Sequence, residues 1–473
     1  MRVTTALLAL LAGSWQLAAA QQNPRIAQAL EVAKVYLDAT RAYQQIPGLS
    51  VAIVKDQDVI WSGGFGVSDL EKKTPASAST IYSICSISKL FTSVAVMQLR
   101  DEGKLRLDDP VAKHLSWFAL KRAKAEAGDI TIEGLLTHAS GLPRESNQPY
   151  WTGPDFPFPT HDQIVAGLSQ QEALYPAETY FQYSNLGITL AGEIVSAASG
   201  KSYGDYVQAR ILGPLGMTST SPEMPAAEQG KRLATGYSSI TRSGTRDKIQ
   251  FFQAKGIAPA AGYASTVEDL GKFASWQFKT LAGGWQEVLK LSTLREMQRI
   301  HWVDPDNETT WGLGFAVWRT GGKAFVGHGG SCPGYRSQLV LRPEEKIAVV
   351  VAGNAMIDAG GIAQDVYALM ASALTGKAPE KPDPDLSAYL GTYAGQPWTG
   401  ESAIVAWEDG LAEMSLPNDD PLNELTRLRK TGEHTFRRVR KDGELGEEVK
   451  FEMGPDGKAT ALIWFSNRRA RLR

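Results

Sequence analysis

The pattern of apolar positions near the N-terminus predicts a helix followed by a β-hairpin. Apolar residues recur at helical spacing over residues 24–45. The apolar run 50–54 predicts a strand, the polar residues 55–58 a turn, and residues 59–61 a returning strand. We expect the hairpin to be closed by three glycines, Gly63, Gly64 and Gly66.

A second helical pattern, apolar almost all round, covers residues 87–102. Such a helix is buried within a large domain, and Gly103 is placed to end it. Residues 104–255 alternate short helical segments with loops rich in Pro and Gly, which predicts a largely helical subdomain.

Strand patterns return at 324–326, 337–341 and 347–351, and a helical pattern follows at 362–374. Strands from both ends of this part of the chain, around one helical insertion, predict an antiparallel sheet flanked by helices. The predicted fold class is therefore α/β (α+β), with a helical subdomain beside the sheet.

The C-terminal part has a different pattern. Residues 376–386 hold three prolines among charged residues, which predicts a linker. Short alternating runs with Asp-Gly turns follow, and these are typical of hairpins: 403–407, 411–416, 435–439, 448–453 and 459–465. We predict a small all-β, barrel-like domain over residues 386–473.

Length and charge narrow the class of protein. A chain of 473 residues exceeds what one hydrophobic core usually serves, so more than one domain is expected. Lys plus Arg number 49 and Asp plus Glu 51, a net charge of −2. This balance does not favour nucleic acid or an anionic membrane as a partner.

Residues 1–20 have the pattern of a secretory signal peptide. One charge, Arg2, precedes the apolar stretch 6–12, and the small residues 18–20 offer a cleavage site. The alternative is a membrane anchor, but the apolar stretch is much shorter than the roughly 20 residues of a spanning helix. We expect a periplasmic or secreted protein with no membrane contact after removal of the signal.

Ser86-Ile-Ser-Lys89 is a Ser-x-x-Lys motif at the start of the buried helix. Residues three apart share a helix face, so Lys89 can reach the Ser86 hydroxyl. A serine hydroxyl is a weak nucleophile until a neighbour takes its proton. Lys89 can do so if burial and nearby positive charge lower its pKa. A serine that only caps the helix is the ordinary alternative.

Tyr183-Ser184-Asn185 precedes another helical run. A tyrosine beside a lysine can move a proton, and we expect positive charge to lower the pKa of Tyr183 from its usual value of about 10. Asn185 offers an amide to a substrate carbonyl. The ordinary alternative is a packed tyrosine followed by a capping asparagine.

His328-Gly329-Gly330 follows the strand predicted at 324–326. Two glycines allow a substrate backbone to approach closely, and histidine can donate a hydrogen bond or carry a proton near neutral pH. A turn with a surface histidine is the ordinary alternative.

The three motifs each occur once, in this order. Together they resemble the serine β-lactamase and penicillin-binding protein family, closest to its class C branch with related esterases and D-aminopeptidases. Further stretches that resemble this family lie at 48–54, 101–110, 135–143, 214–217 and 328–335. The resemblance covers roughly residues 28–375, and it predicts a β-lactamase/transpeptidase-like serine hydrolase domain over residues 21–380.

The resemblance implies four catalytic residues, Ser86, Lys89, Tyr183 and His328. Ser86 would attack a carbonyl to form an acyl-enzyme, which water then releases, and Lys89 and Tyr183 would together manage the proton. No metal or organic cofactor is implied. The partner would be a small-molecule or peptide substrate, and the sequence gives no oligomeric state.

The resemblance also implies substrate-binding residues, Asn185, Gly329, Gly330 and Ser331. The backbone N–H groups of Ser86 and Ser331 would form the oxyanion hole.

One motif departs from the class C pattern, because His328-Gly-Gly stands where those enzymes have Lys-Thr-Gly. A histidine is mostly neutral at pH 7, which favours ester or amide bonds, including D-amino-acid peptides, over β-lactams. The alternatives are a true β-lactamase or D,D-peptidase, a non-catalytic penicillin-binding sensor, and a structural protein on a dead hydrolase fold.

The sequence contains no Gly-x-Ser-x-Gly, phosphate-loop or His-Glu-x-x-His motif, and His138 is interpreted as structural.

The two cysteines, Cys85 and Cys332, are too few for a disulfide framework or a structural zinc site. If Ser86 and Ser331 both donate N–H groups to one oxyanion, their nitrogens lie within about 6 Å of each other. Because Cys85 precedes one donor and Cys332 follows the other, we expect the cysteines to lie close together. The sequence leaves open whether they form a disulfide.

Overall fold

The computed structural model describes residues 23–121, 128–147, 150–380 and 383–473. The predicted signal peptide, residues 1–20, lies outside these residues. None of the described helices is long and apolar enough to cross a membrane. The chain divides into two compact units, one of Pro47–Ala363 and one that joins Met1–Ile46 to Gln364–Arg473.

An antiparallel sheet organises the first unit. Within the described residues it has nine strands in the order β3-β2-β1-β11-β10-β9-β8-β7-β6. Its strands are β1 Gly48–Lys55, β2 Asp58–Asp69, β3 Thr74–Pro75, β6 Trp302–Val303, β7 Thr310–Trp311, β8 Ala316–Thr320, β9 Lys323–Cys332, β10 Tyr335–Arg342 and β11 Ile347–Gly353. Leu49 of β1 pairs with Gly353 of β11, which confirms that strands from both ends of this part of the chain meet in one sheet.

Two strands run further than the sequence predicted. The glycines expected to close the first hairpin lie within β2 and pair with β1, as Gly63 does with Val51. A Cβ atom at Gly64 would lie 2.4 Å from the carbonyl oxygen of Ala76. Glycine is therefore required here, because the segment that contains Ala76 passes directly against β2. Likewise, β9 continues to Cys332, so His328 lies inside a strand rather than after it.

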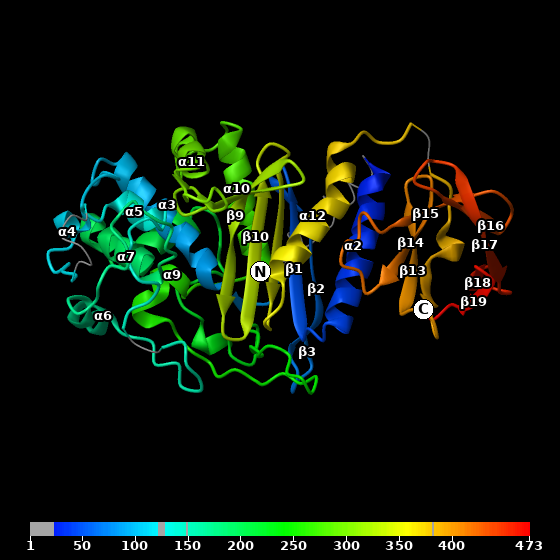
Figure 1. Ribbon diagram of the computed structural model, residues 1–473, viewed down its shortest axis with the longest axis horizontal. Helices are drawn as coiled ribbons and strands as arrows, with labels where there is room; N and C mark the ends of the chain where they lie inside the picture. The colour runs from blue at the N-terminus through cyan, green and yellow to red at the C-terminus, as the bar shows by residue number, and fades with distance from the viewer. Residues whose placement is uncertain (1–22, 122–127, 148–149, 381–382) are drawn as a thin grey trace, which may run out of the picture. The chain divides into compact units, whose positions relative to one another are not determined.

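Helices fill the rest of the first unit. They are α3 Ser88–Asp101, α4 Val111–His114, α5 Ile132–Leu136, α6 His161–Leu168, α7 Asn185–Ser199, α8 Tyr203–Val207, α9 Ala258–Ala261, α10 Val267–Leu281 and α11 Leu291–Met297. In Figure 1 the helical part that contains α3, α5 and α7 lies beside the β9 side of the sheet. The predicted helical subdomain is confirmed, since the described part of residues 104–255 has helices and no extended strand.

Helix α3 forms the centre of this unit's core. All its residues from Ser88 to Leu99 are buried, as its all-round apolar pattern predicted. The Phe91 ring lies 4.9 Å from the rings of both Tyr263 and Phe273. The helix that carries Lys89, and that begins directly after the turn of Ser86, is therefore packed on every side.

The second unit contains an eight-stranded antiparallel sheet in the order β12 to β19. Its strands are β12 Gly391–Ala394, β13 Glu401–Trp407, β14 Gly410–Leu416, β15 Thr426–Lys430, β16 Thr435–Val439, β17 Leu445–Met453, β18 Ala459–Trp464 and β19 Asn467–Ala470. A bridge between Tyr393 and Arg471 brings its two ends together, so the sheet is a nearly closed barrel. The five predicted strands are confirmed.

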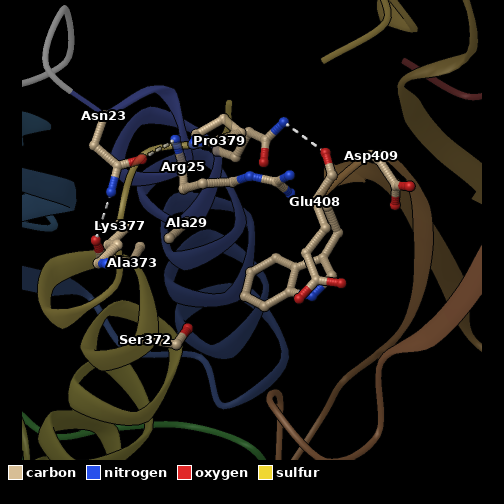
Figure 2. Close-up of a pocket in the computed structure, with 11 residues that line it drawn as sticks. Asn23, Arg25, Ala29, Ser372, Ala373, Lys377, Pro379, Glu408 and Asp409 are labelled. Carbon is tan, nitrogen blue, oxygen red and sulfur yellow. Dashed lines mark hydrogen bonds between the residues drawn. The ribbon is translucent and has the colours of Figure 1, made fainter. Parts of the chain in front are cut away.

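Helix α2 (Pro24–Tyr43) and the end of helix α12 (Ala359–Thr375) also belong to this unit. The Asn23 side chain caps α2 and donates to the carbonyl of Ala373 (3.0 Å). A cavity of about 350 Å³ lies beside this cap, and Figure 2 shows residues that line it, among them Asn23, Ala373 and Glu408. Gln28 donates to the carbonyl of Glu408 (3.1 Å). The domain division predicted from sequence, at residues 380–386, stays a prediction.

Candidate active site

Ser86 lies in a single turn of 3-10 helix, Cys85–Ile87, which leads directly into α3. The turn is fixed by its neighbours. Cys85 has a positive φ of 51°, the Ser88 hydroxyl donates to the carbonyl of Cys85, and the N–H of Tyr263 donates to the Ser88 hydroxyl (3.0 Å). The half-buried Ser86 side chain is thereby presented at the surface of a cavity.

Lys89 is fully buried and makes three hydrogen bonds from its Nζ. The acceptors are the Ser86 Oγ (3.2 Å), the Asn185 Oδ1 (2.6 Å) and the carbonyl of Ala260 (2.8 Å). Burial lowers the pKa of Lys89 well below its usual range, Glu145 opposes this shift and Arg144 adds to it. The structure thus confirms the lowered lysine pKa that the motif requires for a proton acceptor.

Tyr183 lies over Lys89, with the Nζ 4.8 Å from the centre of its ring. The expectation for its acidity is wrong in direction. Burial raises the pKa of Tyr183 above its usual value, while a hydrogen bond with Ser86 and the charge of Arg144 only partly oppose the rise. Desolvation outweighs the nearby positive charge, so the phenol keeps its proton at neutral pH.

Asn185 is the first residue of α7, after the capping Ser184. Its Oδ1 accepts from Lys89 and its Nδ2 donates to Glu145 (2.6 Å). An amide has a second lone pair and a second N–H, so Asn185 retains one acceptor and one donor after both bonds. Its position places it between the lysine and an acidic partner that the sequence had not indicated.

His138 packs against the segment that contains Tyr183 and Ser184. Its Nδ1 accepts from the N–H of Ser184 (3.1 Å), and its ring lies 4.3 Å from the ring of Tyr183. Both contacts fit the structural role predicted for it.

His328 is buried on β9, with its ring 6.2 Å from that of Tyr183. Its Nδ1 lies 2.6 Å from the carbonyl of Gly329. Because a carbonyl only accepts, Nδ1 carries the proton, and Nε2 is a buried acceptor with no partner. Burial and the charge of Lys89 lower the pKa of His328 to about 3, so the ring is neutral at pH 7, as expected from sequence.

The end of β9 forms one wall of the site. Strand β8 pairs with β9 only as far as Gly327, and the following residues pair with β10 on their other side. A Cβ atom at Gly330 would lie 2.2 Å from both the carbonyl oxygen of Ile84 and the Ser337 Oγ. Glycine is required here because the strand passes directly against the turn that carries Ser86.

Cys85 and Cys332 are joined by a disulfide with a Cα–Cα distance of 5.8 Å. The expected proximity is therefore confirmed, and the question that the sequence left open is answered by a bond. It links the turn of Ser86 to the strand of Ser331.

The predicted site residues come together around two cavities of about 330 Å³ each. Ser86, Arg144 and Ser331 line both of them. The first also has Tyr183, His328, Gly329 and Gly330 in its lining, and the second has Asn185. Lys89 lies behind Ser86 and reaches it by a hydrogen bond.

Sequence reasoning missed Arg144 and Glu145. Arg144 lies 4.9 Å from the centre of the Tyr183 ring, and Glu145 accepts from Asn185. The only signal was their position, directly after the family-like stretch 135–143. In the part of the chain that the structure describes, no three His, Cys, Asp or Glu residues are grouped to hold a metal ion.

Comparisons with known proteins agree with this arrangement. The family model described as Beta-lactamase matches residues 34–372, close to the range of the resemblance. Protein flp of Staphylococcus aureus (strain N315) is 29% identical over 317 residues, which cover 65% of this chain and 60% of that protein. The chain thus spans about 60% of the length of such curated relatives.

Solved structures give the same fold. The octameric penicillin-binding protein homologue from Pyrococcus abyssi is 27% identical, with a TM-score of 0.63, over 93% of this chain and 100% of that one. The D-stereospecific amidohydrolase from Streptomyces sp. is 25% identical, with a TM-score of 0.56, over 69% of this chain and 94% of that one.

Proposed function

Because this chain belongs to the beta-lactamase family, we propose that it is a serine hydrolase that cleaves ester or amide bonds through an acyl-enzyme on Ser86. The observation that carries the proposal is the bond of 3.2 Å between the Lys89 Nζ and the Ser86 Oγ. A buried lysine with a lowered pKa is a neutral amine for part of its time, and such an amine can accept the serine proton.

In the proposed first step, the Ser86 Oγ attacks the substrate carbonyl carbon while its proton passes to Lys89. The carbonyl oxygen becomes an oxyanion, which the backbone N–H groups of Ser86 and Ser331 stabilise. The disulfide between the neighbouring Cys85 and Cys332 supports this pairing of donors.

The tetrahedral intermediate then collapses, and the bond to the leaving group breaks. The leaving atom takes a proton from Tyr183, whose raised pKa keeps the phenol protonated and ready to act as an acid. Tyr183 recovers a proton from Lys89, which restores the neutral amine. Water repeats the sequence on the acyl-enzyme, with Ser86 as the leaving group, and releases the acid.

His328 has a different role in this proposal. Its pKa of about 3 rules it out as a cation near neutral pH. A neutral ring at this position offers no cation to bind a carboxylate of the substrate. Esters and amides, including those of D-amino acids, are therefore proposed over β-lactams. The D-stereospecific amidohydrolase among the similar structures is consistent with this class.

Export is proposed from the signal-like pattern of residues 1–20, and the partner is a small-molecule or peptide substrate.

The test of the proposed hydrolase activity is hydrolysis of p-nitrophenyl acetate by the wild type and by Ser86→Ala. We expect the variant to retain less than a few per cent of the wild-type rate. Retention of more than that would contradict the proposal, and a wild type that is acylated without turnover would indicate a sensor instead.

A further inference from the structure

The cleft at Ser86 has two lobes with different chemistry. We call the cavity that contains Tyr183 the first lobe and the cavity that contains Asn185 the second lobe. Both have volumes at the lower end of the range for small-molecule sites, about 300–1,000 Å³. Since Ser86 and Ser331 line both lobes, a substrate carbonyl at Ser86 would have one substituent in each.

The proton donor decides which substituent enters which lobe. An acid that protonates the leaving atom must lie within hydrogen-bond reach of it. Tyr183 lines the first lobe and not the second, and it shares a hydrogen bond with Ser86. The leaving group therefore belongs in the first lobe, and the acyl group in the second.

The second lobe has an apolar wall. Beside the polar residues Arg144, Glu145 and Asn185, its lining includes three apolar, half-buried side chains, Trp151, Pro333 and Met356. The Trp151 ring is supported by Phe158 at 5.0 Å and by Tyr150 at 5.8 Å. A ring held in this way is a rigid platform, and its contact with an apolar group costs little conformational entropy.

The first lobe has a polar wall. Its lining includes the polar side chains Arg336, Gln338 and Asp358, which lie among Ser337, Ile357 and Ala359. The Arg336 Nε is buried and has no hydrogen-bond partner. The side chain as a whole is half-buried and lines this lobe, so its charge faces a polar leaving group placed there.

We propose that the enzyme selects esters or amides of apolar, aromatic-sized acids, with the acyl group against Trp151 and Met356 and a polar leaving group beside Arg336. This inference rests on the proposed acyl transfer at Ser86. It assigns specificity to residues outside the three motifs, since Trp151, Met356 and Arg336 belong to none of them.

The test varies the acyl group at a constant leaving group. We would measure kcat/KM for p-nitrophenyl acetate, butyrate and phenylacetate with the wild type, Trp151→Ala and Trp398→Ala. Trp398 is the matched control, because it is 77% exposed and lines neither lobe. A hydrophobic pocket discriminates by about 10- to 200-fold, so we expect at least about a tenfold preference for phenylacetate in the wild type.

Trp151→Ala should lose most of this preference, and Trp398→Ala should keep it. A wild type that prefers acetate, or a folded Trp151→Ala that keeps the phenylacetate preference, would overturn the inference. If thermal unfolding shows that Trp151→Ala is not folded, Met356→Ala takes its place with the same expectation.

A fluorophosphonate probe separates the two levels of the argument. Labelling of Ser86 without any acyl preference contradicts only the division of the cleft. Failure of the wild type to label contradicts the proposed function itself.

Discussion

Cys85 and Cys332 are joined by a disulfide, and each is the direct neighbour of a serine in the site, Ser86 on one side and Ser331 on the other. The bond spans 247 residues of sequence. It therefore links two parts of the chain that are distant in sequence. The proposed oxyanion hole requires the N–H groups of Ser86 and Ser331, one from each part, to lie close together.

Removal of this bond should lower both stability and turnover. We expect the double variant Cys85→Ala, Cys332→Ala to lose about 2–5 kcal/mol of unfolding free energy, the usual range for a native disulfide. The rate constant kcat should fall more than KM changes, because the oxyanion donors lose their common restraint. Urea unfolding and ester kinetics measure the two effects.

The single variants provide the control, since each breaks the same bond and should match the double variant. Two alkylated thiols in non-reduced wild-type protein, found by mass spectrometry, would contradict the bond.

The lowered pKa of Lys89 predicts how activity depends on pH. The neutral amine accepts the serine proton, so kcat/KM should fall as the pH drops through this lowered pKa and the amine becomes protonated. Towards alkaline pH, activity should persist while Tyr183 keeps its proton, because its pKa is raised. A pH profile of ester hydrolysis tests both limbs, and activity that rises as the pH falls would contradict the assignment.

Tyr183→Phe tests the proposed acid. The substitution keeps the ring that packs on His138 and removes the hydroxyl that bonds Ser86. We expect kcat to fall by at least about 100-fold, the scale of general acid–base groups, with little change in the melting temperature. The loss of kcat should be larger for an amide than for a p-nitrophenyl ester, because the amine leaving group must be protonated before it departs. An unchanged kcat on both substrates would argue that Tyr183 only packs, because the phenylalanine keeps the packing ring.

Gly330→Ala tests how tightly β9 passes the turn of Ser86. The added methyl group would lie 2.2 Å from the carbonyl oxygen of Ile84, so the turn must move. We expect hydrolysis to fall by at least about tenfold, in line with the cost of small displacements at a reacting centre. Gly167→Ala is the matched control, since a Cβ there meets nothing within 4 Å, and it should behave as wild type. Full activity of Gly330→Ala would show that the turn is not so constrained.

Sequence patterns predicted the elements of the site better than their electrostatics. The Ser-x-x-Lys spacing placed Lys89 against Ser86 correctly, because helix geometry alone fixes that contact. The pKa of Tyr183 was predicted in the wrong direction. Positive charge is visible in a sequence, whereas the burial that outweighs it depends on side chains from distant segments.

The limits of strands were harder to predict than their existence. The glycines of β2 were predicted to end the hairpin, but they lie within the strand. Gly64 is needed there because Ala76 passes close to the strand. The barrel strands β12, β15 and β19 were missed because they are short or strongly polar, as in Thr426–Lys430. Arg336 belongs to no recognisable sequence motif. Its position in the same cavity as Ser86 is known only from the folded structure.

The most direct test of the account is to trap the acyl-enzyme and locate it. The protein would be quenched in acid during turnover of p-nitrophenyl phenylacetate, digested with protease and mapped by mass spectrometry. We expect the acyl mass on the peptide that contains Ser86, and no acylated peptide from Ser86→Ala. Acylation at another residue, or the same adduct in Ser86→Ala, would contradict the central claim.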